Sequence, residues 1–218
     1  MSELLLPLGY LSHSAKTLWK SDKQSYRNKY YYRNNVSSLS SPEIDFGKNI
    51  AEQLETMNIT NPMLKYFIDS GQLPVYPVRE HELRVTIEGV PLLGKLDMFH
   101  PATLTFRDDK TGHKEWTQKI VDKHPQLPFY SLLIKEKYGS VNEQCYLDWM
   151  QTEMVNETNT IIINGTEYTS TIQVPQFTGH IELFERTITD MDRFRELQDI
   201  VQCAHEISAD YKRFLENQ

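Results

Sequence analysis

The alternation of apolar and polar residues predicts strands in the middle of the chain. Residues 83–90 alternate as a half-buried strand should, and residues 92–99 and 103–110 predict two more strands around a turn at residues 100–102. Residues 143–151 have the same character. We therefore expect three consecutive strands followed, after an interruption, by a fourth.

A hairpin is predicted further along the chain. The run Thr160-Ile161-Ile162-Ile163 is followed by Asn164-Gly165 and then by residues 166–174, which are rich in Thr, Tyr, Ile and Val. Asn-Gly suits the type I′ turn that joins two antiparallel strands, because both residues accept a positive φ.

Helical periodicity surrounds these strands. Residues 12–33 contain no Pro or Gly, and Ser12 or Ser14 can cap them, so we expect one helix there, followed by a polar loop at 34–41. Ser41-Pro42-Glu43 is typical of an N-cap, a first-turn Pro and a first-turn acid. The helix that follows places one apolar stripe inward: Phe46, Ile50, Leu54 and Met57.

Two more helices are predicted in the second half of the chain. One covers residues 126–138, and the last opens with Thr189-x-x-Asp192. The side chains expected to face inward from the last helix are Met191, Phe194, Leu197, Val201, Ala204, Tyr211 and Phe214. The order of elements predicts an α/β fold in which helices flank a mixed central sheet.

Length and composition limit the class of protein. A chain of 218 residues is long enough for one well-buried core, and no apolar run approaches the roughly 20 residues that span a bilayer. The first seven residues lack the cationic region and apolar length of a secretory signal. We expect a cytoplasmic protein with no membrane partner, in which Cys145 and Cys203 are buried thiols.

The net charge of −7 hides a basic segment near the N-terminus. Residues 15–33 hold six cations against one acid, Asp22, and interleave them with aromatic residues. Single-stranded nucleic acid binds such surfaces through base stacking and phosphate attraction. The candidate contacts are Lys20, Lys23, Lys29, Tyr30 and Tyr31. The alternative is an amphipathic helix whose tyrosines are core residues and whose lysines are solvated.

Candidate chemistry is concentrated at Asp97 and at Asp108-Asp109-Lys110. Alternation along a strand places Asp108 and Lys110 on one face. A turn at 100–102 pairs Asp97 roughly opposite Phe106, so Asp108 is its diagonal neighbour at about 7–8 Å. Two carboxylates at that spacing suit Mg²⁺, and a nearby lysine can stabilise charge on a phosphate. The alternative is a solvent-exposed Asp-Asp-Lys turn.

The order of motifs adds a family resemblance. Gly94-x-x-Asp97 is followed by Asp108-x-Lys110-Thr111 and by Gln126-x-x-x-Tyr130, with a glycine-containing helix upstream at residues 46–55 and Leu11-Ser12-His13-Ser14 before it. Over residues 11 to about 138 the chain resembles the RecB-like exonuclease branch of the PD-(D/E)XK nuclease superfamily.

The resemblance implies a fold and a site. It implies a single nuclease domain over 1–218, with a restriction-endonuclease-like αβββαβ core. The N-terminal helical segment would cover 11–33, the catalytic core 41–151, and an added hairpin and helix 160–218. Asp97 and Asp108 would bind Mg²⁺ or Mn²⁺, helped by the backbone carbonyl of Asp109. Lys110 would be catalytic, and Gln126 and Tyr130 would contact the DNA strand.

The chain departs from that pattern in two places. Relatives carry His or an acid four residues after the helix glycine, where this chain has Ala51. On a helical wheel Glu55 lies about 40° from that position and Glu52 about 100°, so Glu55 is the favoured replacement ligand; alternatively, both are solvated charges. The chain also lacks the cysteine cluster with which some relatives hold iron–sulfur, so we expect no such cluster.

These features predict a divalent-metal-dependent deoxyribonuclease, an exonuclease that acts on single strands or duplex ends in recombination, repair or phage DNA metabolism. No G-x-x-x-x-G-K-[ST] motif is present, so unwinding would require a helicase or recombination partner. Two alternatives remain. One is a catalytically impaired nucleic-acid-binding protein of the same fold, and the other is a structure-specific endonuclease.

Overall fold

The fold is built on a six-stranded mixed sheet with the order β1-β3-β4-β5-β6, in which β2 also pairs with β3. The computed structural model describes residues 4–33, 41–164 and 166–217. The strands are β1 (Leu11–Ser12), β2 (Val78–Ile87), β3 (Val90–His100), β4 (Thr105–Gly112), β5 (Gln144–Ile163) and β6 (Thr166–Thr187). β1 pairs with β3, and β4 with β5, in parallel; the other pairs are antiparallel.

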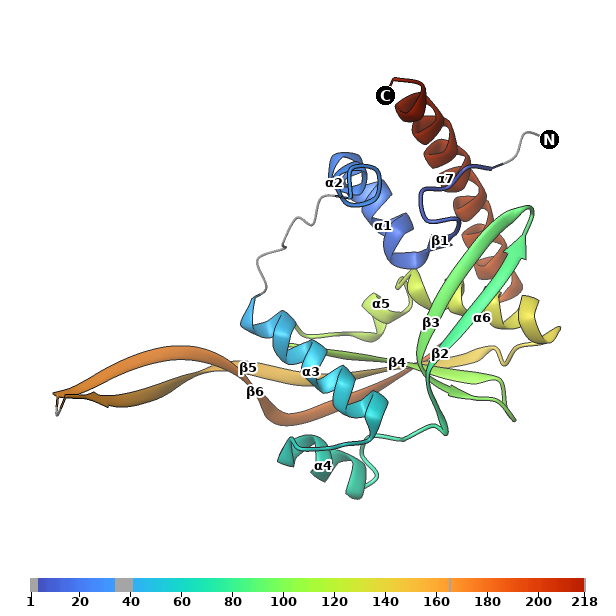
Figure 1. Cartoon of the computed structure of the whole chain (residues 1–218). Coiled ribbons are helices and arrows are strands. Elements are labelled where there is room, and N and C mark those ends of the chain that lie inside the picture. Colours follow the sequence, from blue (N-terminus) through green and yellow to red (C-terminus); the bar gives the residue numbers. More distant parts are fainter. Residues whose placement is uncertain (1–3, 34–40, 165, 218) are drawn as a thin grey trace.

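Helices lie against the sheet, as the sequence predicts (Figure 1). They are α1 (His13–Ser21), α2 (Lys23–Tyr30), α3 (Pro42–Thr56), α4 (Pro62–Asp69), α5 (Gln118–Val121), α6 (Gln126–Tyr138) and α7 (Asp190–Glu216). The larger apolar core joins α1, α6 and α7 to the strands, and a smaller one lies under α3 and α4. Within the described residues no helix is long and apolar enough to cross a bilayer.

Several local predictions are confirmed. The Ser41 hydroxyl accepts from the Ile44 N–H at the start of α3, and Thr189 and Asp192 form a reciprocal capping box on α7. α6 covers the predicted residues 126–138, with Pro128 in its first turn, where its missing N–H has no intrahelical partner to lose. The two cysteines are free and buried.

The single helix expected over 12–33 is wrong. Asp22 is extended (φ −154°) and ends α1; its carboxylate accepts from the N–H groups of Gln24 and Ser25 and so begins α2. A capping acid thus breaks a segment that has helical propensity throughout. The loop expected at 34–41 lies, apart from Ser41, outside the described residues.

The predicted apolar faces of α3 and α7 are also partly wrong. Met57 is 45% exposed, because it ends α3 in the left-handed conformation. Met191 and Phe194 are more than half exposed, because the inward face of α7 begins with Arg193 and Glu196. Arg193 donates to the Ser131 hydroxyl and to the Ile188 carbonyl, while Glu196 pairs with Lys16. Arg193 and Glu196 can be buried because each has a polar or charged partner, whereas the pattern of apolar and polar residues predicts only apolar side chains on a buried face.

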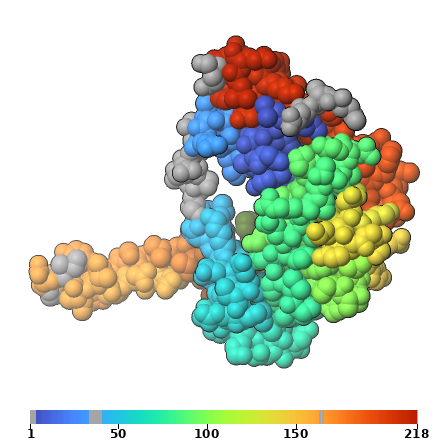
Figure 2. Space-filling view, turned by 45° about the vertical axis from the view of Figure 1, so that its right-hand side comes forward, coloured from blue at the N-terminus to red at the C-terminus, as the bar shows by residue number. Residues whose placement is uncertain are grey.

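The predicted strand at 143–151 and the predicted hairpin at 160–174 are one continuous feature. β5 and β6 stay in antiparallel register from Gln144 and Thr187 to Ile163 and Thr166, with one irregularity between Met150 and Thr152. Their far half leaves the body of the molecule as a two-stranded arm (Figures 1 and 2). The sequence analysis did not predict β1, α4 or α5.

Candidate functional site

The β3–β4 hairpin brings the acidic residues close to one another. Phe99 pairs with Phe106 and Met98 with Arg107, so the predicted pairing of Asp97 with Phe106 is wrong by two residues. The turn is longer than expected, because His100 pairs with Thr105. The paired register ends at Met98 and Arg107, and beyond it Asp97 accepts from the Asp109 N–H. Asp97 lines the same cavity as Asp109 and Thr111, whereas Asp108 does not line it.

Asp97 and Asp109 line a cavity beneath α3. The Asp109 N–H donates to Asp97 Oδ2 at 2.9 Å. The polar and small residues that line it are Gly47, Ala51, Glu55, Glu80, Asp97, Asp109 and Thr111, and three apolar side chains complete the lining: Ile50, Leu54 and Met150. A Cβ on Gly47 would lie 3.0 Å from Thr111 Oγ1, so glycine is what allows α3 to approach β4 this closely.

Asp108 and Lys110 face α6. Lys110 Nζ lies 2.6 Å from Asp108 Oδ2 and 3.3 Å from Gln126 Oε1, and Gln126 Nε2 donates to the Tyr130 hydroxyl at 2.7 Å. Asp108 is fully buried. The four side chains form one connected polar chain in an otherwise apolar layer, so the structure brings together the residues that the sequence singled out in β4 and α6.

Close packing of α6 on β3 positions this chain. A Cβ on Gly94 would collide with the Leu133 side chain and press on the Tyr130 ring. Glycine at this point of β3 therefore lets the first turns of α6 lie directly on the sheet, with Gln126 turned toward Lys110.

Burial and like charge control the protonation of the site. Burial, and then the charge of Asp108, raise the pKa of Asp97 to about 7. Burial, and then the neighbouring carboxylates, also raise the pKa of Asp109. Burial alone would lower the pKa of Lys110, but Asp108 and Asp97 outweigh it and raise that pKa, so the lysine is a cation at neutral pH.

Three buried carboxylate oxygens lack a hydrogen-bond partner: Oδ1 and Oδ2 of Asp108 and Oδ1 of Asp109. Of these, Asp108 Oδ2 forms an ion pair with Lys110. Buried acceptors without partners are costly, and hard divalent cations prefer carboxylate oxygens, so these residues fit such an ion. Across the described ranges, however, no three His, Cys, Asp or Glu side chains already have positions that would hold a metal ion.

The third acidic ligand has two structural candidates. Glu55 lines the cavity and lies 3.8 Å from Lys95 Nζ, whereas Glu52 does not line it. Glu80 also lines the cavity and pairs with the same lysine. Glu80 was not among the predicted ligands, because the strand that contains it was expected to begin at residue 83, whereas β2 begins at Val78. Glu80 has φ +48°, and the β2–β3 register sets it opposite Asp97.

A second cavity, of about 520 Å³, adjoins the α6 end of the polar chain. Its polar lining includes Tyr10, Ser12, His13, Tyr30, Gln126 and Tyr130. Burial, and then the charge of Lys16, lower the pKa of His13 to about 4, so its ring is neutral at neutral pH. Because this cavity shares Gln126 and Tyr130 with the polar chain, a ligand in it would lie beside Gln126, whose Oε1 is 3.3 Å from Lys110 Nζ.

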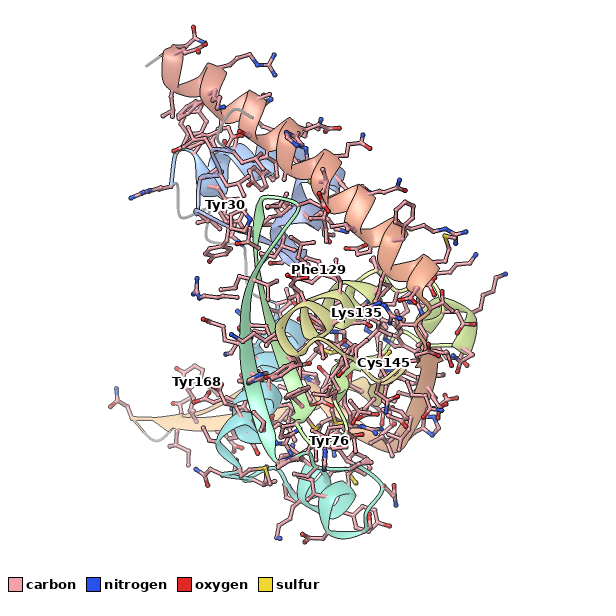
Figure 3. The ribbon with its side chains drawn as sticks, turned by 90° about the vertical axis from the view of Figure 1, so that its right-hand side faces the viewer. Tyr30, Tyr76, Phe129, Lys135, Cys145 and Tyr168 are labelled. Carbon is pink, nitrogen blue, oxygen red and sulfur yellow. The ribbon has the colours of Figure 1, made fainter. Side chains whose placement is uncertain are left out.

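The basic N-terminal segment packs mainly on α7. Lys20 pairs with Asp199 at 2.6 Å and Lys23 with Glu206 at 3.2 Å, while Tyr31 is buried and contacts Tyr211 and Phe214. These contacts favour the packing role for Lys20, Lys23 and Tyr31. Tyr30 lines the second cavity, and Lys29 Nζ lies 5.2 Å from the centre of its ring. Figure 3 shows Tyr30 and Phe129 on the side of the sheet near α7.

Solved structures of exonucleases share this fold. No family model and no curated protein matches the sequence. A phage-related exonuclease from Haemophilus somnus 129PT superposes with a TM-score of 0.53 at 14% identity, over 95% of this chain and 86% of that one. A protein from Eubacterium rectale that is assigned as an exonuclease gives a TM-score of 0.52 at 11% identity, over 91% and 82%. The chain therefore has the fold of these two proteins.

Proposed function

We propose that the chain is a divalent-metal-dependent deoxyribonuclease of the PD-(D/E)XK type that removes nucleotides from DNA ends. The observation that carries the proposal is the position of Lys110, which lies between buried Asp108 and Gln126. Asp97 lies next to the same strand, where it accepts from the Asp109 N–H. The shared fold of two exonucleases supports it. A role in recombination, repair or phage DNA metabolism, together with a helicase partner, belongs to the same proposal.

Asp97, Asp108 and the Asp109 carbonyl would hold Mg²⁺ or Mn²⁺, with a further carboxylate from the α3 cavity. When bound, the ion polarises the phosphodiester and lowers the pKa of water. Asp108 is buried, and its charge helps to raise the pKa of Asp97, so an ion bound by both carboxylates would relieve this repulsion.

The chain's own residues supply orientation and charge. Protonated Lys110 can donate to a phosphate oxygen whose negative charge grows in the transition state. Gln126 accepts from Lys110 and is itself held by Tyr130, so the ammonium has a fixed direction. The second cavity lies within the size range of small-molecule sites, and its tyrosines and hydroxyls suit a base and a sugar-phosphate.

Incubating the protein with end-labelled linear DNA, circular DNA and single strands, each with Mg²⁺ or with EDTA, tests the proposal. We expect Mg²⁺-dependent release of nucleotides from linear DNA and no cleavage of circles. Cleavage of circles would identify an endonuclease. Binding without cleavage in both Mg²⁺ and Mn²⁺ would identify a binding protein.

The α3 cavity gives a prediction about the third ligand. Glu55→Gln should lower activity at least about ten-fold, roughly 1.4 kcal/mol, because it removes a carboxylate that lines the same cavity as Asp97. Glu52→Gln, on the same helix but outside the cavity, is the matched control and should change little. Ala51→His should partly rescue the Glu55 variant, since imidazole accepts Mn²⁺. Loss of activity in Glu80→Gln alone would assign the role to Glu80 instead.

The second cavity gives a prediction about strand binding. Tyr30→Ala should weaken binding of a single-stranded oligonucleotide, measured in EDTA, by about 5- to 150-fold, because one stacked base contributes about 1–3 kcal/mol. Tyr32→Ala is the control, since Tyr32 is 50% exposed and packs on Phe214 away from this cavity. Equal affinity for both variants and the parent would exclude Tyr30 from the binding surface.

A further inference from the structure

The far half of the β5–β6 hairpin is an arm without a partner in the described chain. Beyond Thr152 and Phe177 the two strands continue in register over residues 153–163 and 166–176, and none of their described side chains is buried. Phe177 fixes the base of the arm by packing on Phe46 and Phe67. Figure 2 shows the arm projecting away from the body of the molecule.

The arm has two chemically different faces. Residues paired across the strands share a face, and the faces alternate along each strand. One face, the apolar arm face, carries Val155, Ile161, Tyr168, Ile172 and Val174. Thr158, Thr160, Thr169 and Thr171 form the middle of the other face, with Ile162 near the turn and the pair Met154 and Pro175 at its base. On the apolar arm face Ile161 is 58% exposed and Tyr168 53%.

This arrangement is unfavourable in an isolated molecule. A two-stranded ribbon that packs on nothing is marginally stable in water, and open strand edges next to apolar side chains promote association. A phosphate backbone does not suit the surface, because residues 152–179 contain three Glu and no Lys, Arg or His. The surface therefore fits a protein.

We propose that the apolar arm face docks on the same face of a second copy of this chain, with the two arms antiparallel about a two-fold axis. The apolar layers Val155/Val174 and Ile161/Tyr168 lie on either side of the midpoint of the arm. Antiparallel stacking therefore places each apolar layer of one copy over the other apolar layer of its partner.

The charge on the arm selects the antiparallel arrangement. Glu157 and Asn159 occupy neighbouring layers of the apolar arm face on either side of its midpoint. In an antiparallel stack Glu157 of one copy meets the layer of Asn159 in the other. In a parallel stack about a two-fold axis Glu157 would instead lie over Ile172 of the other copy, which leaves the carboxylate against an apolar side chain without a polar partner.

The size of the surface sets the strength of the contact. A ribbon of about eleven residues at roughly 3.3 Å each, and about 10 Å wide, buries on the order of 400 Å² per copy, or about 800 Å² in total. This is below the roughly 1,200–2,000 Å² of stable specific interfaces and in the range of weak, transient ones. We therefore expect a dimer that dissociates on dilution.

Analytical ultracentrifugation of the full chain from about 1 to about 300 µM tests the contact. We expect a monomer–dimer equilibrium that I161D/Y168D weakens at least about ten-fold. T160D/T169D, the adjacent cross-strand pair on the opposite face, is the matched control and should leave the equilibrium unchanged. Because the arm lies outside both cores, unfolding temperature and nuclease activity serve as checks that all variants fold. A parent that stays monomeric throughout, or a control that weakens the dimer equally, overturns the proposal.

Cross-linking tests the direction of the arms. V155C/I161C should give a covalent dimer with a short bis-maleimide, whereas V155C alone should give little, because its two copies are far apart in the antiparallel stack. The natural cysteines, Cys145 and Cys203, are buried and do not compete. Efficient cross-linking of V155C alone would indicate parallel arms and overturn the antiparallel arrangement.

Discussion

Replacing Lys110 with Ala should lower DNA cleavage by at least about 10³-fold, roughly 4 kcal/mol, while binding of DNA in EDTA changes little. Lys110 is held between Asp108 and Gln126, and its raised pKa keeps it cationic. A fixed cation at this position stabilises charge that develops only in the transition state, so its loss affects turnover more than affinity. Single-turnover cleavage of end-labelled DNA measures the effect.

The matched control is Lys135→Ala on α6. Lys135 is exposed and pairs with Asp190, away from both cavities, so its removal should leave turnover unchanged. Circular dichroism and the unfolding temperature show whether the Lys110 variant retains the fold, because the change also leaves Asp108 without its ion-pair partner. Turnover at the parent's rate in a folded Lys110→Ala protein would exclude a catalytic role for this lysine.

Sequence alone predicted the parts of the site that depend on local signals. Strand alternation placed Asp108 and Lys110 on one face, and the i, i+4 spacing of Gln126 and Tyr130 placed both on one face of a helix whose bounds were correct. The structure adds that these two faces meet. That meeting depends on Gly94, whose missing side chain lets α6 approach β3.

The parts that sequence missed depend on tertiary context. The β3–β4 register depends on a turn that continues to Leu104, which has φ +52°. No local pattern in the sequence predicts the length of this turn. The apolar stripe of α7 was misassigned because Arg193 and Glu196 are buried with partners that lie far away in sequence. Lys20 and Lys23 were predicted to contact DNA, but they form ion pairs with Asp199 and Glu206 of α7, which also lie far away in the sequence.

Replacing Asp97 with Asn should stabilise the metal-free protein at pH 8. In the fold the pKa of Asp97 is raised from 3.8 to about 7 by burial and by the charge of Asp108. A carboxyl whose folded pKa lies above its unfolded value stabilises the fold fully below about pH 4, and this contribution is lost as the pH rises through about 7. The neutral amide avoids that loss and keeps an acceptor for the Asp109 N–H.

The expected gain in the free energy of unfolding at pH 8 is on the order of 2–4 kcal/mol, and it should vanish near pH 4, where the parent is also neutral at this position. Asp69→Asn, at an exposed acid paired with Lys65, is the control and should show no comparable gain. Chemical denaturation in EDTA at the two pH values measures both.

The same substitution should remove metal binding. Calorimetry should show Mn²⁺ binding to the parent and none to Asp97→Asn or Asp108→Asn, and Mn²⁺ should raise the unfolding temperature of the parent alone, because an ion stabilises only a fold that binds it. The Asp97→Asn variant should therefore be more stable than the parent without metal, but its unfolding temperature should not rise when Mn²⁺ is added. A variant that binds Mn²⁺ as tightly as the parent does would remove Asp97 from the metal site. If the Asp97→Asn variant and the parent were equally stable at pH 8, the charge of Asp97 would not destabilise the fold.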